Sequence, residues 1–536
     1  MQNWQQSYDP LGSPLASTLV AAIPIVVLLG ALASGKLKAH WAALLALAVA
    51  ILISTTVVGM PWSAAMAATG MGAAYGLLPI GWIVLNTIFL YQITKEQGAF
   101  DRMQVAITSL SGDKRIQLVL IAFALGSFFE GAAGFGTPVA ITGALLLALG
   151  FTPLQASTLS LIANTAPVAF GAMGTPIIAL AGVTGIDIDL LSKMVGRQLP
   201  FFSVIVPFWL IAAYDGVRGV RETWPTLLVA GLSFAIPQFL VSNFHGPWLV
   251  DVTSGLSCVL CTSLFARHSK ATQTAEARTA PRWSKEQLAA WMPWLIMSVL
   301  VFICGFAAVK AVLNDLFAPK IPVPFLDGVI QRVPPVVASI QQEAAVYTFN
   351  LLSATGTAIL IAAVLGGLFL GLGLKQLAHT YRRTIALTWT SLLTITAMMA
   401  IGYVTRYSGL DAILGLAFAR SGVLYPIFGT MLGWLGVALT GSDTSSNVLF
   451  GSLQKITAGQ LGLSPVLMAA ANSSGGVMGK MIDAQSIVVA STATRWYGHE
   501  GKILRFVFWH SIALALLVAL LVLLQAYVPP FTAMVP

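Results

Sequence analysis

The stretch FFEGAAGFGTPVA, Phe128 to Ala140, lies within one of the most apolar parts of the chain. It contains a glutamate, three glycines and a proline at places where a membrane-spanning helix would carry leucines. Glycine and proline end helices and leave backbone N–H groups unpaired at the start of the next helical segment. Within a bilayer, irregular backbone of this kind persists only where protein or a water-filled cavity surrounds it. The stretch therefore predicts an interrupted helix that lines an internal site.

The whole chain has the composition of a membrane protein. Of its 536 residues, 57% are hydrophobic and only 9% are charged, whereas soluble domains carry about 25% charged residues. Apolar runs of about 20 residues, long enough to cross a bilayer, recur from end to end. We expect an all-α polytopic membrane protein with about twelve full spans and two re-entrant or interrupted hairpin regions. Nucleic acid is not an expected partner, because the residues behind the net charge of +9 lie in loops between the spans.

The charges of successive loops predict the orientation of the chain in the bilayer. Lys36 and Lys38 follow the first apolar run, and the most basic loop lies at 267–285, so both are expected inside. The acidic segment 185–189 and the proline-rich loop 310–345 are expected outside, the latter as a plain connector. This alternation places both termini on the outer, periplasmic side.

An internal repeat relates the two halves of the chain at a shift of about 308 residues. Gly134 and Thr137 correspond to Gly441 and Thr444, and Asn164 corresponds to Asn472. The number of apolar segments between the copies is odd, so the copies have opposite orientations. Inverted repeats with interrupted helices are typical of secondary transporters, whose site lies where the interruptions meet.

The repeat also predicts the domain organisation. A first half, 1–268, contains the first copy at about 95–182, and a second half, 287–536, contains the second copy at about 405–492. The segment 269–286 is the only soluble-looking internal linker and is expected to be cytoplasmic.

Each copy of the repeat contains two broken places. They are 130–138 and 163–176 in the first copy, and 441–446 and 471–483 in the second. Free N–H groups at the starts of half-helices, together with hydroxyl and amide side chains, suit a small anion. The alternative is that the glycines serve packing and the prolines are tolerated kinks.

Four charged residues lie inside apolar runs, where each costs a few kcal/mol. They are Glu130, Asp443, Lys480 and Asp483, and none has a charged counterpart in the other copy. Lys480 is a candidate to receive a substrate carboxylate, and a buried acid that keeps its proton near neutral pH could carry that proton across the membrane. Alternatively, Lys480 and Asp483 neutralise each other as a structural pair, and Glu130 faces interfacial water.

Four long motifs resemble the lactate permease family, the bacterial L-lactate and glycolate permeases. They are FFEGAAGFGTPVAITGALLLALGF, ANTAPVAFGAMGTP, GSDTSSNVLFG and AANSSGGVMGKMIDAQSIVVA. The resemblance covers essentially the whole chain. It implies a proton symporter of the bacterial inner membrane for L-lactate, often also for D-lactate and glycolate, and not an enzyme. The family is grouped with the ion transporter superfamily, whose members have inverted repeats and re-entrant hairpins and move by an elevator mechanism.

The resemblance also implies which residues meet a small 2-hydroxy monocarboxylate. The carboxylate would meet Lys480 and the starts of half-helices, and Asn164, Thr165, Asn472 or Ser473 could bond the 2-hydroxyl. The full set of expected substrate-binding residues is Gly134, Gly136, Thr137, Asn164, Thr165, Ser442, Thr444, Ser445, Asn472, Ser473, Ser474 and Lys480. Glu130, Asp443 and Asp483 are the candidate proton carriers, and the sequence does not choose among them.

Several alternatives remain at this point. Hydroxyl- and carbonyl-rich turns also suit sodium, so a sodium-coupled monocarboxylate transporter is the main rival, followed by an anion channel. No metal constellation or phosphate-binding loop stands out in the sequence, so neither a metal site nor a cofactor is expected. The protein is expected to lie in the lipid bilayer as a monomer or a homodimer.

Overall fold

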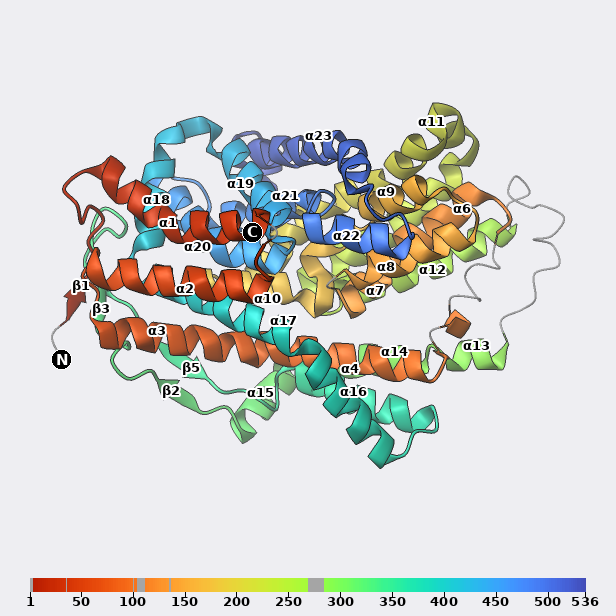
Figure 1. Ribbon diagram of the computed structural model, residues 1–536, viewed down its shortest axis with the longest axis horizontal. Coiled ribbons are helices and arrows are strands. Elements are labelled where there is room, and N and C mark those ends of the chain that lie inside the picture. Colours follow the sequence, from red (N-terminus) through yellow and green to blue (C-terminus); the bar gives the residue numbers. More distant parts are fainter. Residues whose placement is uncertain (1–2, 35, 100, 104–110, 135, 269–283) are drawn as a thin grey trace.

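The computed structural model describes the whole chain except residues 1–2, 35, 100, 104–110, 135 and 269–283. The described chain is mostly helical (Figure 1). Nine helical ranges in it are long and apolar enough to cross a membrane, or ten if one bent pair counts as a span. A multi-pass helical membrane protein is therefore confirmed, whereas the count of twelve spans stays a prediction. Most of the predicted linker, 269–283, lies outside the described residues.

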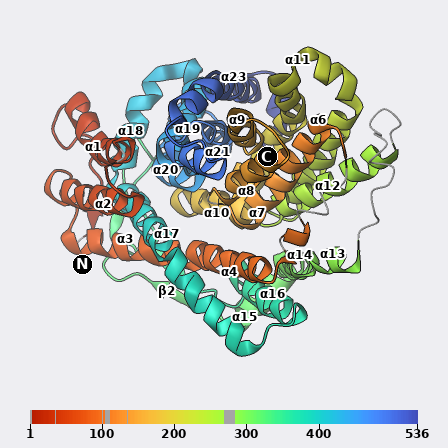
Figure 2. The ribbon, with the colours of Figure 1, turned by 45° about the vertical axis from the view of Figure 1, so that its right-hand side comes forward.

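One part of the molecule is a layer of helices organised around its longest straight helix. Its elements are α1 (Pro14–Ala33), α2 (Ala39–Thr56), α3 (Trp62–Tyr75), η1 (Gly76–Gly81), α4 (Trp82–Glu96), α13 (Lys285–Ala289), α14 (Met292–Gly305), α15 (Ala307–Leu316), α16 (Thr355–Phe369) and α17 (Leu374–Ser408). Helix α17 packs against α2, α3 and α4, while α16 packs against α4 and α14 (Figure 2). We call these ten elements together the α17 layer. Because α16 and α17 come from the second half of the sequence and α3 and α4 from the first, the two halves interlock.

The remaining helices form a second body, the site bundle, which lies against the α17 layer (Figure 2). Its elements are α6 (Lys114–Leu118), η2 (Val119–Leu125), α7 (Gly126–Ala132), α8 (Thr137–Ala148), α9 (Pro153–Ala163), η3 (Val168–Phe170), α10 (Gly171–Thr184), α11 (Ile188–Phe244), α12 (Val250–His268), α18 (Leu410–Phe418), η5 (Ala419–Leu424), α19 (Tyr425–Thr440), α20 (Asp443–Gln460), α21 (Pro465–Gly479), α22 (Ala484–Ala493), α23 (Glu500–Tyr527) and η6 (Phe531–Met534). Helix α11 spans 57 residues but is broken at Gly216, which has a φ of 67° and non-helical geometry. It therefore consists of two helices.

Five short strands make the expectation of an all-α chain wrong in one region. They are β1 (Trp4–Gln5), β2 (Lys320–Pro322), β3 (Ile330–Arg332), β4 (Gln341–Gln342) and β5 (Val346–Thr348). They form a sheet of order β1-β3-β4 and a β2–β5 pair, in which Trp4 lies opposite Ile330 and Ile321 opposite Tyr347. The loop expected to be a plain connector thus holds the N-terminal segment (Figure 1), because extended backbone needs partners for its N–H and C=O groups.

Both interrupted regions near the site are hairpins of helices. In the first, α6, η2 and α7 form one arm and α8 forms the other, and the Lys114 ammonium at the start donates to the Gly150 carbonyl at the end over 3.0 Å. In the second, α19 and α20 reverse direction at Gly441, which has a φ of 71°. The two ends of the predicted hairpin over 116–150 therefore lie in contact. Its return to its own side of the membrane stays a prediction.

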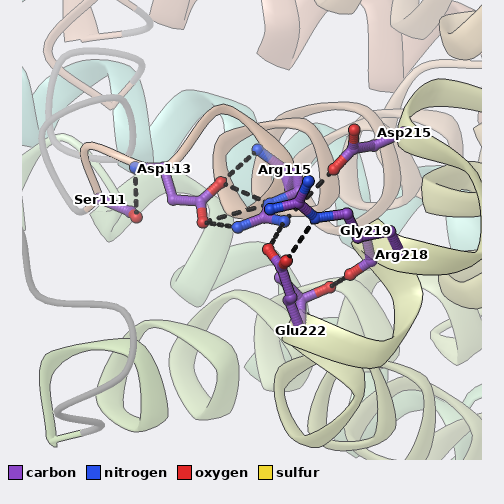
Figure 3. A network of polar contacts seen from close by, with 8 residues as sticks. Ser111, Asp113, Arg115, Asp215, Arg218, Gly219 and Glu222 are labelled. Carbon is purple, nitrogen blue, oxygen red and sulfur yellow. Dashed lines mark hydrogen bonds and ion pairs between the residues drawn. The ribbon is translucent and has the colours of Figure 1, made fainter.

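An ion-pair network fastens the open end of the first hairpin to the bend of α11 (Figure 3). The Arg115 guanidinium lies 2.9 Å from the carboxylate of Asp113, 3.3 Å from that of Asp215 and 2.6 Å from that of Glu222. Glu222 also accepts from Arg218 over 2.8 Å. One arginine therefore joins the hairpin to the segment between the two halves of α11.

The network gives a pH-dependent contribution to stability. Arg115, followed by Arg218, holds the pKa of the Glu222 carboxyl below its ordinary value of 4.5. A lowered pKa contributes stability above the unfolded-state pKa, and this contribution is lost as the pH falls through the folded-state value. We expect the melting temperature of Glu222→Gln in detergent to lie below that of the parent at pH 7, and the gap to close as the pH falls below 4.5. A gap that stayed constant with pH would contradict this assignment.

Helix α12 crosses the first hairpin at Gly255 of α12 and Gly131 of α7, and neither position has room for a side chain. A β-carbon on Gly255 would lie 2.6 Å from the Phe128 backbone nitrogen. We expect Gly255→Val to push α12 away from α7 and to destabilise the protein by about 1–3 kcal/mol, the usual cost of overpacking. Thermal unfolding in detergent would measure it. The matched control is Gly459→Val in α20, where no heavy atom lies within 4 Å of the new β-carbon; equal losses in both variants would refute the packing argument.

Candidate functional site

Two neighbouring cavities lie where the breaks of the site bundle meet. The α17 cavity, of about 120 Å³, lies between Ser391, Thr394 and Met398 of α17 on one side and the hairpin tips and α22 on the other. The inner cavity, of about 50 Å³, is bordered by Glu130, by Thr175 of α10 and by Asp443. The two cavities share the lining residues Gly441, Ser442, Thr444 and Lys480. They therefore form one polar region reached from both the α17 layer and the centre of the bundle.

Lys480 lies at the junction of the two cavities. It is 7% exposed, and its ammonium donates to the Gly441 carbonyl over 2.5 Å. The same ammonium lies 3.5 Å from the carboxylate of Asp483. Of the two sequence-based alternatives, the structural pair with Asp483 is thus present, yet Lys480 also faces both cavities.

The three candidate proton carriers are all buried, with exposures of 5% for Glu130, 3% for Asp443 and 1% for Asp483. Asp443 accepts from Ser473 over 2.5 Å and from Asn447 over 3.3 Å. Asp483 caps α22 by accepting from the Ser486 N–H over 2.7 Å. Within the described chain, one carboxylate oxygen of Glu130 and one of Asp443 have no hydrogen-bond partner, whereas the second oxygen of Asp483 faces the Lys480 ammonium at 3.5 Å. A buried oxygen without a partner is a place for a proton or a ligand donor.

Three helices begin at the cavities, and the starts of α8 and α10 depend on left-handed backbone. Gly136, with a φ of 80°, precedes α8, and no side chain caps that helix. Ser442 precedes α20 and accepts from the Ser445 N–H over 3.2 Å. In α10 three successive left-handed residues, Ala172, Met173 and Gly174, delay the regular helix until Thr175. Left-handed alanine and methionine are strained, and helix starts attract anions.

The amino-acid sequence matches one protein family over almost the whole chain. The sequence profile of the family described as L-lactate permease covers residues 17–529. The chain belongs to the L-lactate permease family. It is 46% identical to the glycolate permease GlcA of Escherichia coli K12 and 44% identical to the L-lactate permease of Salmonella typhimurium, over 100% of both chains in each case. It is 43% identical to the L-lactate permease of Bacillus subtilis, over 99% of this chain and 100% of that one. The protein is thus a membrane transporter and not an enzyme.

The permease brings together about half of the residues expected at its site. Those that line the cavities are Glu130, Gly134, Gly136, Ser442, Asp443, Thr444, Ser445 and Lys480. The remaining expected residues are not among the lining residues of these two cavities: Thr137, Asn164, Thr165, Asn472, Ser473, Ser474 and Asp483. Phe135 lies outside the described residues.

The fourth predicted break, 471–483, is present only in its last part. Helix α21 continues through Asn472–Gly476 to Gly479, and the chain breaks at Lys480–Asp483, within the predicted range. The glycines serve packing. A β-carbon on Gly476 would lie 2.9 Å from the Val437 side chain of α19. Glycine lets α19 and α21 approach closely, as small residues do between membrane helices.

Asn472 belongs to a buried polar network behind the cavities. Its amide nitrogen donates to Asn447 over 3.0 Å, and its amide oxygen accepts from Gln454 over 3.2 Å. Ser474 donates to Gln198 over 2.6 Å. Both ends of the Asn472 amide are therefore occupied by protein, and its role in the permease is to hold α20 and α21 together.

Sequence reasoning missed several polar residues of the permease. Asn447, Gln454 and Gln198 support the site from behind, and Ser391 and Thr394 face it from α17. Gln198, Ser391 and Thr394 are polar residues in long apolar ranges, which is the signal that could have found them. Asn447 and Gln454 lie on α20, whose sequence contains many polar residues, so they carry no such signal.

Polar residues of the supporting network and polar residues that line the cavities should respond differently when their side chains are truncated. Asn472→Ala leaves Asn447 and Gln454 with unmet hydrogen bonds, so we expect it to destabilise the permease by about 1–3 kcal/mol. Ser445→Ala removes a hydroxyl that lines the α17 cavity, and we expect stability to change by no more than about 0.5 kcal/mol. Melting curves of the two purified variants would test this. Equal destabilisation would mean that the assignment of Asn472 to the supporting network is wrong.

Proposed function

We propose that the permease is a secondary active transporter that carries L-lactate, and also D-lactate and glycolate, together with protons across the bacterial inner membrane. The observation that carries this proposal is the position of Lys480. Among the described residues that line the two cavities it is the only cation, and the buried acids Glu130, Asp443 and Asp483 outnumber it. The names of the relatives, L-lactate permeases and a glycolate permease, supply the substrate class.

Lys480 and the helix starts account for binding of the carboxylate. A substrate carboxylate can take the ammonium of Lys480 in place of the Gly441 carbonyl, from which the ammonium is 2.5 Å away. The first turn of α20 lies beside it and adds backbone N–H groups. The hydroxyls of Thr444 and Ser445, which line the α17 cavity, are placed to meet a 2-hydroxyl group. Met398 and Ile395 of α17 offer an apolar wall to the methyl group that distinguishes lactate from glycolate.

Charge balance accounts for proton coupling. If Glu130, Asp443 and Asp483 were all ionised, they would outnumber Lys480 three to one before the substrate brings a further negative charge. Each uncompensated charge in the interior of a membrane protein is costly. Binding of an anion is therefore favoured when protons are held by one or more of these acids, which ties substrate binding to proton binding.

The arrangement of the two bodies supports an elevator movement and inverted repeats. Helix α10, which follows the broken segment of the first copy, packs against α20 of the second, and α22 packs against α8 in return. This reciprocal packing is what two inverted copies produce. The α17 cavity lies between the site bundle and the α17 layer, so sliding of one body past the other would expose it on alternate sides. In this proposal both termini are periplasmic, and the protein acts as a monomer or a homodimer.

The decisive experiment is uptake of labelled L-lactate into liposomes that contain the purified permease, with an imposed pH gradient and no sodium. We expect uphill accumulation that a protonophore abolishes. Accumulation that requires sodium would replace protons by sodium as the coupling ion. Flux that does not saturate and ignores the gradient would identify a channel.

Variants at the site separate binding from coupling. Lys480→Ala removes the cation, so we expect the half-saturation concentration in lactate counterflow to rise at least about tenfold, since a charged hydrogen bond contributes about 1.5–3 kcal/mol. Among Glu130→Gln, Asp443→Asn and Asp483→Asn, the proton carrier is the one that loses uphill uptake and keeps counterflow. Arg218→Ala, on the distant bend of α11, is the matched control for loss of a cation. Unchanged half-saturation in Lys480→Ala would remove Lys480 from the site.

A further inference from the structure

A fourth buried acid, Asp251, lies outside the set that the sequence motifs select. It is in the first turn of α12 and is 1% exposed. Neither of its carboxylate oxygens has a hydrogen-bond partner within the described chain. An acid with two unpartnered oxygens in a protein interior needs an explanation beyond packing.

Asp251 lies directly against the first hairpin, beside Glu130. A β-carbon placed on Gly131 would lie 2.6 Å from the Asp251 β-carbon, so α12 crosses α7 at the residue that follows Glu130. One turn further along, Gly255 of α12 packs on Phe128. Glu130 in turn borders the inner cavity, whose lining also includes Lys480.

The elements that pack around α12 offer Asp251 no counter-charge. They are α7, η2, α10 and α11. Helix α7 contributes Glu130 and no other charged group, and the sequences of η2 and α10 contain none. The charged residues of α11 lie in its first turns and at its bend: Asp189, Lys193, Arg197, Asp215, Arg218, Arg221 and Glu222. Among the described residues, none of these pairs with Asp251.

The start of α12 is not enough to stabilise an ionised Asp251. An acid in the first turn gains from the helix dipole, but mainly by accepting backbone N–H groups. Asp251 accepts none from the described residues. An ionised Asp251 next to an ionised Glu130 would place two like charges in an apolar crossing, which is costly. At least one proton therefore belongs to this pair of carboxyl groups.

We propose that Asp251 is a second proton-binding residue of the permease, which exchanges a proton with Glu130 during transport. This proposal rests on the proposed proton symport. The two carboxyl groups share no hydrogen bond in this structure, so the proton that leaves one acid reaches the carboxylate of the other through a bridging water or after a side-chain rotation. The total charge of the pair does not change. When Asp251 holds the proton, Glu130 is ionised towards the inner cavity and Lys480. When Glu130 holds it, the negative charge is withdrawn from the substrate.

The test is Asp251→Asn in the full-length permease, reconstituted in liposomes. Asparagine keeps the size of the side chain and removes the proton site. We expect lactate counterflow to continue, while uphill accumulation under a pH gradient falls to simple equilibration. The control is Asp411→Asn, at another buried acid, whose carboxylate accepts from the Ala412 N–H over 2.7 Å and from Ser452; accumulation by this variant should match that of the parent. Asp251→Ser serves if the asparagine variant does not fold.

Two outcomes would overturn the assignment. Uphill accumulation by Asp251→Asn equal to that of the parent would show that the transport cycle does not need its proton. Loss of counterflow together with accumulation, in a variant that melts like the parent, would make Asp251 a positioning residue for the hairpin.

A second readout keeps this proposal apart from the proposed function. The infrared carbonyl band of protonated carboxyl groups is measured as a function of pH, with and without lactate. We expect part of this band to change on addition of lactate in the parent and to be missing in Asp251→Asn. If the parent transports lactate with sodium alone, the symport proposal fails and Asp251 fails with it. If the parent is proton-coupled and its lactate-dependent band is unchanged by Asp251→Asn, only the Asp251 assignment fails.

Discussion

The ammonium of Lys480 and the carbonyl of Gly441 meet where two breaks of the site bundle come together. Gly441 ends α19, and the carbonyl end of a helix carries partial negative charge that stabilises a cation. Lys480 follows the last residue of α21. A lysine in this position fixes the tip of the second hairpin to the break before α22, and the two cavities exist on either side of that contact.

Glycine serves two different purposes around this contact, and they explain the shape of the bundle. At Gly136 and Gly441 the backbone is left-handed, with φ of 80° and 71°, and the chain reverses or restarts as a helix. At Gly255 and Gly476 the backbone is helical, and the missing side chain lets two helices approach closely. The left-handed glycines interrupt the helices at the polar region. The helical glycines let neighbouring helices pack tightly around it, and irregular backbone in a membrane requires such surrounding protein.

The sequence could predict the glycines that interrupt helices, but it could not distinguish them from the glycines that allow close helix packing. The breaks at Gly136–Pro138 and Gly441–Ser442 were predictable because one glycine stands two residues before a proline and the other directly before a capping serine. The glycines at Gly475 and Gly476 give the same local signal, but contact with α19 keeps them helical, and only the tertiary structure shows this. The pairing of β1 with β3 involves two residues on each strand, too few for any alternating pattern. Asp251 was visible as a charge at the edge of an apolar run, where it resembles a boundary residue.

The number of buried acids also bears on how a coupled cycle could avoid moving substrate without a proton. Without substrate, Lys480 is neutralised by Asp483 at 3.5 Å and by the Gly441 carbonyl, so the remaining acids are uncompensated unless protonated. A substrate carboxylate that takes over Lys480 frees Asp483, whose charge then has no partner. In the proposed cycle, the loaded site therefore crosses the membrane at low cost only with a proton aboard, because an unpaired buried charge opposes the movement. Coupling then depends on a single lysine being shared between Asp483 and the substrate.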